Sequence, residues 1–431
     1  MTEFNNKSCA FTIVAKNYIG LGEILGKTLK QYNSEIDFYI IVADEFDKIV
    51  NLPANVLIAR NILKYTNEEW RDMSFKYNLT EFCTAIKPAT FEYLLSKGYE
   101  SVIYFDPDIY LFSPIDKILS LLKKYDFVIT PHICGIHKKY NGDQPEWNIN
   151  VNGIFNLGFC GVKNSNTANA IILWWKERLK DQCFCERTLG QFTDQKWMDW
   201  LPAFLNNDKI YVLRDLGMDL APWNFFERKI NKGNDGNFYV SFREEDSGEN
   251  RKDPLVFVHY SGFNYNKLKQ GIVEHKRLSF ADYPDLKEAM DLYGDAIKEN
   301  ADIFDSFIEQ SYSYATFDNG IKIDSFHRRL YHGLDENFRM RINPFSSEKN
   351  SYYSQLEQSK LIDFNSKEGS KHIQSINLDK RNRQLSWFYR LMYRLLGFNR
   401  YTQFVKSMRF YSLPEMHTFL ITPSKIKSER I

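Results

Sequence analysis

The stretch Ser101-Val-Ile-Tyr-Phe-Asp-Pro-Asp-Ile-Tyr-Leu-Phe112 decides the fold, because an apolar strand pattern runs directly into two carboxylates. Residues 102–105 are β-branched or aromatic, which is typical of a short buried strand. Asp106 and Asp108 follow, separated by a proline that cannot donate to a sheet ladder. Residues two apart in an extended chain point the same way, so both carboxylates can converge on one cation. Open α/β sheets keep their ligand sites at the carboxyl ends of strands, so we expect a site here.

The rest of residues 1–285 alternates between strand and helix patterns. Strands are expected at 11–15, 37–43, 56–59, 102–105, 127–130, 156–162 and 255–262. Helical patterns lie between them, one of them over 79–97, where Pro88 predicts a kink or a boundary. The alternation predicts an α/β fold with a parallel sheet and right-handed crossovers. The polar stretch 132–152 is long for a loop in a compact domain and is expected to be functional or irregular.

Composition and charge limit the class of protein. The 431 residues are 43% hydrophobic and 26% charged, which indicates a folded protein of two or three domains, or one domain with an appendage. A formal net charge of +1 gives no reason to expect nucleic acid as a partner. The six cysteines lack the paired spacing of a zinc site, which favours reduced thiols in the cytoplasm. Neither a secretory signal nor a membrane-spanning run is evident, so we expect a soluble or peripheral protein.

The character of the chain changes after about residue 285. We expect an α/β catalytic domain over 1–285, a helical extension over 286–345, a polar linker over 346–379 and a basic amphipathic segment over 380–431. Within this last segment, residues 380–409 carry eight basic residues and no acidic one, with aromatic residues between them. Such a segment suits an anionic membrane surface, here the inner face of the cell membrane. The alternative is an ordinary helix packed on the catalytic domain.

A third candidate ligand supports the two aspartates. His259 falls within the last apolar strand pattern, and two carboxylates with an imidazole suit Mn²⁺ better than Ca²⁺ or an all-protein Mg²⁺ site. An Asp-x-Asp triplet alone is weak, because about one is expected by chance in a chain of this length. A lone histidine at a strand end is also more often structural, so the site needs independent support.

Six short motifs, within residues 11–265, provide that support by their order. They are Ile13-Val-Ala-Lys-Asn-Tyr18, Ala85-Ile-Lys87, Tyr104-Phe-Asp-Pro-Asp108, Phe155-Asn-Leu-Gly158, Thr193-Asp-Gln195 and Val258-His-Tyr-Ser-Gly262. The set resembles glycosyltransferase family eight, the retaining galactosyltransferase-type enzymes, and related bacterial polysaccharide glycosyltransferases. The resemblance implies a GT-A fold, a mostly parallel central sheet flanked by helices, with a mainly helical C-terminal extension. It also implies a metal-dependent hexosyltransferase that moves a sugar from a nucleotide-diphosphate donor to a glycan or lipid-linked acceptor, with retention.

The resemblance implies a metal and nucleotide site. Asp106, Asp108 and His259 would bind Mn²⁺ (or Mg²⁺) bridging the diphosphate of a UDP-sugar. Ala15, Asn17 and Tyr18 would hold the nucleotide, Tyr18 by stacking on uracil, and Gly262 would let the backbone approach the diphosphate.

The resemblance also assigns the donor-sugar end. Lys87 and Asn156 would contact the sugar or its phosphates, and Lys87 would neutralise charge developing on the leaving diphosphate. Asp194 would hold sugar hydroxyls, with a helix cap as its alternative role. Gln195 would lie beneath the anomeric carbon; it is a poor nucleophile, which favours front-face attack by the acceptor over a covalent intermediate.

Two departures from the family pattern leave the donor open. Lys16 stands where the family has an aspartate, and Tyr265 stands where the family has a lysine, with Lys267 two residues later. A donor other than UDP-galactose is therefore compatible with the sequence. Two further functions stay open: a sugar-1-phosphate nucleotidyltransferase, and a non-catalytic membrane-associated scaffold in which the aspartates cap a strand.

Overall fold

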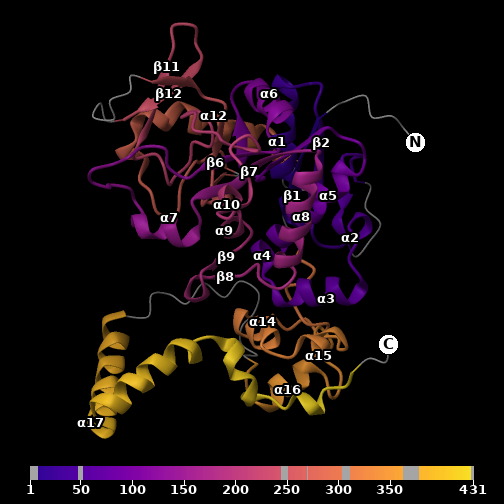
Figure 1. Ribbon diagram of the computed structural model, residues 1–431, viewed down its shortest axis with the longest axis vertical. Coiled ribbons are helices and arrows are strands. Elements are labelled where there is room, and N and C mark those ends of the chain that lie inside the picture. Colours follow the sequence, from indigo (N-terminus) through magenta and orange to yellow (C-terminus); the bar gives the residue numbers. More distant parts are fainter. Residues whose placement is uncertain are drawn as a thin grey trace. The chain divides into compact units, whose positions relative to one another are not determined.

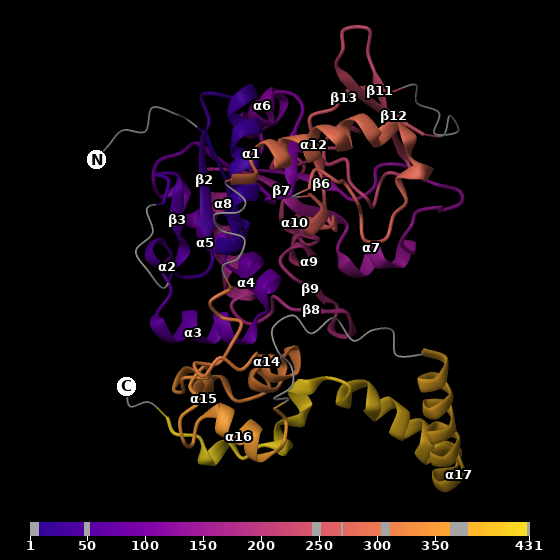
Figure 2. The ribbon, with the colours of Figure 1, turned by 180° about the vertical axis from the view of Figure 1, so that it is seen from behind.

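The computed structural model describes residues 8–46, 52–243, 251–268, 270–302, 311–362 and 378–428 (Figures 1 and 2). The chain forms two compact units, Met1–Lys64 with Leu79–Tyr312, and Tyr65–Asn78 with Ser313–Ile431. This division differs from the four segments expected from composition. Helix α12 (Lys287–Glu299) stays with the first unit because its Met290, Tyr293 and Ile297 are buried in a core cluster of that unit.

A seven-stranded sheet forms the centre of the first unit, in the order β10-β6-β7-β4-β1-β2-β3. Its strands are β1 (Ser8–Val14), β2 (Asp37–Val42), β3 (Val56–Ile58), β4 (Ser101–Phe105), β6 (Phe127–Pro131), β7 (Phe155–Lys163) and β10 (Ile210–Val212). Strand β7 is antiparallel to both of its neighbours, and the other pairs are parallel. Helix α1 (Ile19–Tyr32) connects the parallel strands β1 and β2, as the opening pattern predicted. The expected α/β fold with a mostly parallel sheet is confirmed.

Helices cover both faces of this sheet because side chains alternate along its strands. From β1, Ala10 and Val14 face a core shared with α1 and with α6 (Asp116–Lys124). Phe11 of the same strand points to the opposite face, where its ring packs edge-on against Phe91 of α5 (Lys87–Leu95), with ring centroids 4.9 Å apart. Phe91 in turn lies 6.5 Å from Trp175 of α8 (Asn166–Leu179). Helices α5 and α8 therefore cover the face opposite α1 and α6 (Figure 1).

Shorter elements complete the first unit. The expected helix 79–97 is divided into α4 (Leu79–Ala85) and α5, with Pro88 in the first turn of α5, so the predicted boundary is present. Two small sheets pair β5 (Ile109–Leu111) with β14 (Phe257–His259), and β8 (Cys185–Glu186) with β9 (Gln191–Phe192). A third contains β11 (Arg228–Lys232), β12 (Phe238–Phe242) and β13 (Lys252–Pro254). The remaining α-helices in the described part of this unit are α2 (Ala59–Ile62), α7 (Glu146–Asn152), α9 (Gln195–Met198), α10 (Leu201–Phe204) and α11 (Tyr265–Leu268).

The second unit is helical and has its own core. It contains α3 (Asn67–Lys76), α14 (Ser325–His332), α15 (Glu336–Met340), α16 (Tyr352–Gln358) and α17 (Leu378–Tyr411). Phe75 of α3 packs in this core against Tyr331 and Tyr352. The guanidinium of Arg328 donates to the carbonyls of Phe75 (2.6 Å) and Tyr77 (3.0 Å) at the end of α3. Helix α16 lies within the expected linker 346–379, whose residues 363–377 are outside the described part.

Helix α17 differs from the others because most of its large apolar side chains are exposed. Trp387 is 66% exposed, Leu395 71% and Phe398 68%. Gly397 interrupts the helix with a left-handed backbone conformation (φ 67°, ψ 173°). The side chains of residues 378–383, which include three of the basic residues, are not described. Among the described helices, none is both long enough and apolar enough to cross a membrane.

Candidate active site

The turn after β4 presents the two aspartates. The backbone N–H of Asp106 donates to the carbonyl of Gly158 on β7 (2.7 Å), which fixes the end of the strand. The carbonyl of Asp106 then accepts from the N–H of Ile109 (3.1 Å), so Pro107 and Asp108 lie in a tight turn. Both aspartate side chains keep some exposure, 30% for Asp106 and 17% for Asp108. They are therefore accessible to a ligand.

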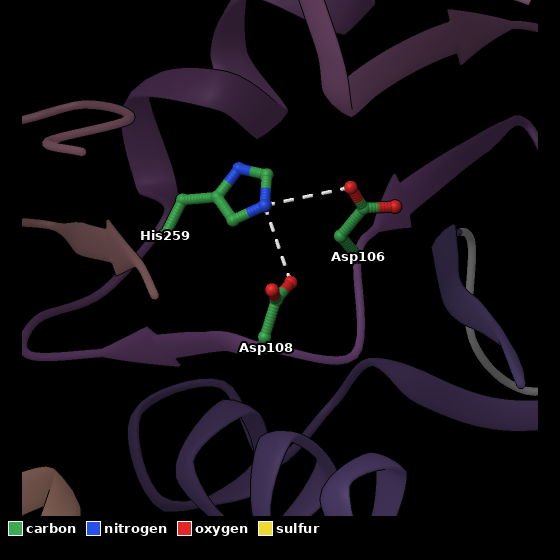
Figure 3. Close-up of side chains that lie close together, drawn as sticks. All are labelled: Asp106, Asp108 and His259. Atoms are coloured by element: carbon green, nitrogen blue, oxygen red, sulfur yellow. Dashed lines mark ion pairs between the residues drawn. The ribbon is translucent and has the colours of Figure 1, made fainter. Parts of the chain in front are cut away.

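Strand pairing brings His259 to this turn. Strand β14 runs antiparallel to β5, with His259 opposite Ile109. Its Nε2 lies 3.2 Å from Oδ1 of Asp108 and 3.5 Å from Oδ2 of Asp106 (Figure 3). One ligand atom from each of the three residues lies within 4.8 Å of the others. The three residues predicted to bind a metal ion are thus brought together from positions about 150 residues apart in the chain.

The surroundings of His259 fit a cation-binding role. A Cβ atom on Gly158 would lie 2.3 Å from Cε1 of His259, so a glycine is required for the imidazole to occupy this position. The ring of Trp223 packs edge-on against the imidazole, with centroids 5.0 Å apart. Two carboxylates and an imidazole with one face held by packing form a suitable donor set for Mn²⁺. The residues present therefore fit the metal that the resemblance implies.

The charges of these groups are strongly coupled. Burial alone would lower the pKa of His259, but the carboxylates of Asp108, Asp219 and Asp106 outweigh burial and hold that pKa well above its ordinary value. Burial raises the pKa of Asp106; Lys87 and His259 oppose this rise, and Asp108 adds to it. Negative charge therefore gathers around the imidazole, which favours a proton or a metal cation at this position.

Lys87 and Asp194 form a buried ion pair beside the aspartates. Lys87 Nζ lies 2.5 Å from Oδ2 of Asp194 and donates to the carbonyl of Leu157 (2.8 Å). The same ammonium lies 3.9 Å from the ring centroid of Tyr104, whose hydroxyl donates to Oδ1 of Asp106. Tyr104 thus connects the ion pair to the candidate metal site. Two residues with separate predicted roles, Lys87 and Asp194, form one charge-balanced group.

A strained turn directs Asp194 inward. Thr193 has a left-handed backbone conformation (φ 47°), which is uncommon for a β-branched residue, and its hydroxyl donates to Oδ1 of Asp194 (3.1 Å). Helix α9 begins at Gln195, and the Asp194 side chain does not cap it. The alternative role of Asp194 as a side-chain cap is therefore not observed. Gln195 is buried, and its Nε2 donates to the carbonyl of Asn152 (2.9 Å).

The first loop places the predicted nucleotide residues after β1. Ala15 is buried, and its carbonyl accepts from the N–H of Tyr18 (2.8 Å). Burial raises the pKa of Tyr18, and the charge of Asp108 adds to the rise, so the phenol lies near the candidate metal site. Asn17 lies in the turn between them, and its Oδ1 has no hydrogen-bond partner among the described residues. Tyr18 thus lies near Asp108, with Ala15 and Asn17 in the same turn.

Lys16, which stands where the resembled family has an aspartate, contacts an acidic residue that follows β2. The backbone N–H of Lys16 donates to Oδ1 of Asp44 (2.8 Å), just after β2, and its Nζ donates to the carbonyl of Glu45 (2.8 Å). Lys16 is buried. Its ammonium group is therefore shielded from solvent at the position where the resembled family has an acidic residue. The carboxylate of Asp44 thus pairs with this loop position.

Two further predicted residues have backbone roles in the structure. Asn156 Oδ1 accepts from the N–H of Gly158 (2.9 Å), which fixes the glycine that makes room for His259. Gly262 has a positive φ of 80°, and a Cβ there would lie 2.8 Å from Nε2 of His275. Lys267, two residues after the position at which the resembled family has a lysine, pairs with Glu274 on the surface. Contacts of Asn156 and Gly262 with a donor remain predictions.

Three residues outside the six motifs also surround the site, and Tyr104, inside one motif, has a contact that was not predicted. Tyr104 contacts Lys87, Thr130 contacts Asp219, and both Asp219 and Trp223 contact His259. Asp219 is completely buried, and its Oδ1 lies 3.5 Å from Nδ1 of His259. The only sequence signal was an acid within an apolar stretch, Leu216–Ala221, and such a pattern does not indicate which group the acid faces.

Comparisons with known proteins give distant similarities. No family model matches the chain. The uncharacterized protein YfnF of Bacillus subtilis (strain 168) is 24% identical over 279 residues, covering 60% of this chain and 84% of that protein. Among solved structures, the galactosyltransferase LgtC is 14% identical, with 59% of this chain and 87% of that chain covered and a TM-score of 0.39. The glycosyltransferase GlyE in Streptococcus pneumoniae TIGR4 is 15% identical, with 76% of this chain and 73% of that chain covered and a TM-score of 0.36. Both of these solved structures are of glycosyltransferases.

Proposed function

We propose that the protein is a metal-dependent hexosyltransferase. It transfers a sugar from a nucleotide-diphosphate donor, a UDP-hexose, to a glycan or lipid-linked acceptor, with retention of configuration. The observation that carries the proposal is the convergence of Asp106, Asp108 and His259, whose ligand atoms lie within 4.8 Å of one another at the end of β4. The order of the six motifs supports the choice of reaction.

Asp106, Asp108 and His259 would hold Mn²⁺ (or Mg²⁺). The cation would supply positive charge to the diphosphate, which is a poor leaving group without it. The aspartates act in this scheme as ligands, and they do not transfer protons to the sugar. Tyr18, which lies near Asp108, would stack on the base, and Ala15 and Asn17 in the same turn would hold the nucleotide.

The ion pair of Lys87 and Asp194 would hold the donor at its sugar end. Lys87 pairs with Asp194, and the carboxylate oxygens of Asp194 can accept hydrogen bonds from sugar hydroxyls. When the donor binds, the ammonium can also stabilise charge that develops on the leaving phosphate. Gln195 is the next residue and the first of α9. Its Nε2 donates to the carbonyl of Asn152, so its Oε1 is the atom of the amide that would face the sugar. A neutral amide oxygen suits stabilisation of an oxocarbenium-like state without forming a lasting covalent bond.

Helix α17 would bring the enzyme to a membrane surface. Phe388, Leu391 and Leu395 recur at helical spacing and are exposed, while Arg390 and Arg394 lie on an adjacent side of the helix. An exposed apolar face with basic residues beside it suits the boundary of an anionic bilayer. A lipid-linked acceptor would be found at this surface.

Release of UDP tests the reaction directly. We expect slow UDP release when the protein is incubated with Mn²⁺ and a panel of UDP-hexoses, because water can replace the acceptor. Asp108→Asn should lower this rate by about 100-fold or more while the circular dichroism spectrum is unchanged. Asp126→Asn, a buried aspartate outside the site, serves as the matched control.

The outcomes separate the three candidate functions. Release of pyrophosphate from UTP and a sugar-1-phosphate would instead indicate a nucleotidyltransferase. Vesicle binding without turnover of any common sugar nucleotide, in the presence of metal, would favour the scaffold and overturn the proposal. Anomeric analysis of the product by NMR tests retention.

A further inference from the structure

Asp219 lies directly behind the imidazole of the candidate metal ligand His259. The neighbouring Leu220 forms a parallel bridge with Val258, and its carbonyl accepts from the N–H of His259 (2.9 Å). Asp219 itself has a left-handed backbone conformation (φ 56°), and its carbonyl accepts from Nδ2 of Asn224 (2.9 Å). These backbone contacts hold a completely buried carboxylate against the ring of His259.

The two facing atoms have no other hydrogen-bond partner among the described residues. They are Oδ1 of Asp219 and Nδ1 of His259, which lie 3.5 Å apart and are both inaccessible to solvent. The second oxygen of Asp219, Oδ2, accepts from the hydroxyl of Thr130 (2.9 Å). Buried polar atoms are rarely left unpaired, because an unpaired group loses its hydrogen bonds to water without gaining others. Each of these atoms gains a partner when the Nδ1–H of His259 donates to Asp219.

This contact determines which nitrogen of His259 is available. Nε2 faces Asp106 and Asp108, at 3.5 Å and 3.2 Å. A proton held on Nδ1 by Asp219 leaves the lone pair of a neutral imidazole on Nε2, directed at the two aspartates. We propose that Asp219 is a positioning residue that fixes the tautomer and orientation of His259 for binding a divalent cation. The inference rests on the proposed metal site and adds a residue that no motif assigns.

The substitution Asp219→Asn keeps the shape of the side chain but removes its negative charge and changes the hydrogen bond that it makes to His259. Thr130 donates to one oxygen of the native carboxylate, and this donor favours the same placement for the oxygen of an asparagine. The amide NH₂ then faces Nδ1 and donates to it, which moves the imidazole proton to Nε2, where the cation should bind. We expect the Kd for Mn²⁺ to increase by about 10–100-fold, the range for loss of such a partner.

A second variant tests the direction of the amide. In Asp219→Asn combined with Thr130→Val, the hydroxyl that orients the amide is removed, so the amide can turn its oxygen toward Nδ1. We expect this double variant to bind Mn²⁺ more tightly than Asp219→Asn alone. A residue that merely fills space would give no such recovery. Asp126→Asn is the control for loss of a buried carboxylate in the same unit, and its Kd should equal that of the wild type.

Mn²⁺ binding is measured on the full chain, without a sugar donor, from the electron paramagnetic resonance signal of the free ion. Circular dichroism and thermal unfolding show whether each variant is folded. Asp219→Asn with wild-type affinity, or a double variant no tighter than the single one, would overturn the inference. Wild-type protein that binds no Mn²⁺ would overturn the metal site, and with it the inference. Wild-type binding without UDP release would contradict the proposed transfer reaction but leave the role of Asp219 intact.

Discussion

At the scale of single residues, the site depends on what surrounds His259. Asp106 and Asp108 lie on the Nε2 side, Asp219 lies on the Nδ1 side, and Trp223 packs against the ring. Gly158 completes the enclosure, because the edge of the imidazole occupies the space that a side chain at this position would fill. The imidazole therefore has little freedom to turn, which keeps its Nε2 near the two carboxylates.

Gly158→Ala should weaken metal binding. The added Cβ would lie 2.3 Å from Cε1 and 2.6 Å from Nδ1 of His259, so the imidazole must move. We expect the Kd for Mn²⁺ to rise by about 10-fold or more, because such ligands tolerate little displacement. Gly161→Ala on the same strand is the control, since its Cβ would meet the end of the Leu122 side chain at 3.1 Å. Equal Mn²⁺ affinities for the two variants, measured by isothermal titration, would show that His259 is not enclosed as described.

The sequence predicted these residues unevenly. Asp106, Asp108 and His259 could be found because each follows or ends an apolar strand, and strand ends are where ligand sites occur. Asp219 and Gly158 act through distances within the folded protein, which residue spacing does not contain. The pairing of Lys87 with Asp194 was missed for the same reason, because the two residues are far apart in the chain and meet only in three dimensions.

At the scale of elements, periodicity predicted the strands well and their directions less well. All strands of the central sheet except β10 were expected from apolar runs, and the βαβ opening followed from the order of patterns. The antiparallel direction of β7 was not expected, because a buried strand has the same apolar pattern in either direction. This direction matters for the site, since it places Asn156 and Gly158 beside the end of β4.

Helix α17 should bind anionic vesicles in a salt-dependent way. Reversing two exposed charges, Arg390→Glu with Arg394→Glu, should lower binding to vesicles of phosphatidylserine and phosphatidylcholine by about 10-fold or more. Each basic residue near such a surface contributes about 1 kcal/mol, and reversal adds repulsion. Co-sedimentation at low and high salt measures the effect. The control reverses Lys123 and Lys124, an exposed basic pair at the end of α6. Equal binding by both double variants and the wild type would remove the membrane role of α17.

At the scale of the whole molecule, the chain forms two units that are not simple successive segments. Residues 65–78 precede much of the first unit in sequence but belong to the second by their contacts. A buried ion network contributes to this: Asp72 lies 2.6 Å from Nζ of Lys76 and 2.9 Å from Nε of Arg339 on α15. Composition could not predict this arrangement, because α3 reads as an ordinary helix within the α/β region.

Acid should destabilise the second unit through Asp72. Burial alone would raise the pKa of this carboxyl, but Lys76 and Arg339 outweigh burial and lower it below its ordinary value. A carboxyl with a lowered pKa in the folded state stabilises in full above its unfolded pKa of about 4. The stabilisation is lost as the pH falls from there through the lower folded pKa. In Asp72→Asn, we expect a loss of about 3–5 kcal/mol at pH 7, because Lys76 and Arg339 lose their buried partner.

The difference in unfolding free energy between wild type and Asp72→Asn should therefore shrink as the pH falls from 7 to 3. Urea unfolding followed by pulsed hydrogen exchange, read on peptides from 65–78, measures this difference for the second unit. Asp291→Asn is the control, because Asp291 also pairs with a lysine four residues away but is 53% exposed. Exposed pairs of this kind contribute about 0.5 kcal/mol or less, so the control should follow the wild type at every pH. A difference for Asp72→Asn that stays constant with pH would show that the carboxyl has the same pKa in both states, contrary to its burial between two cations.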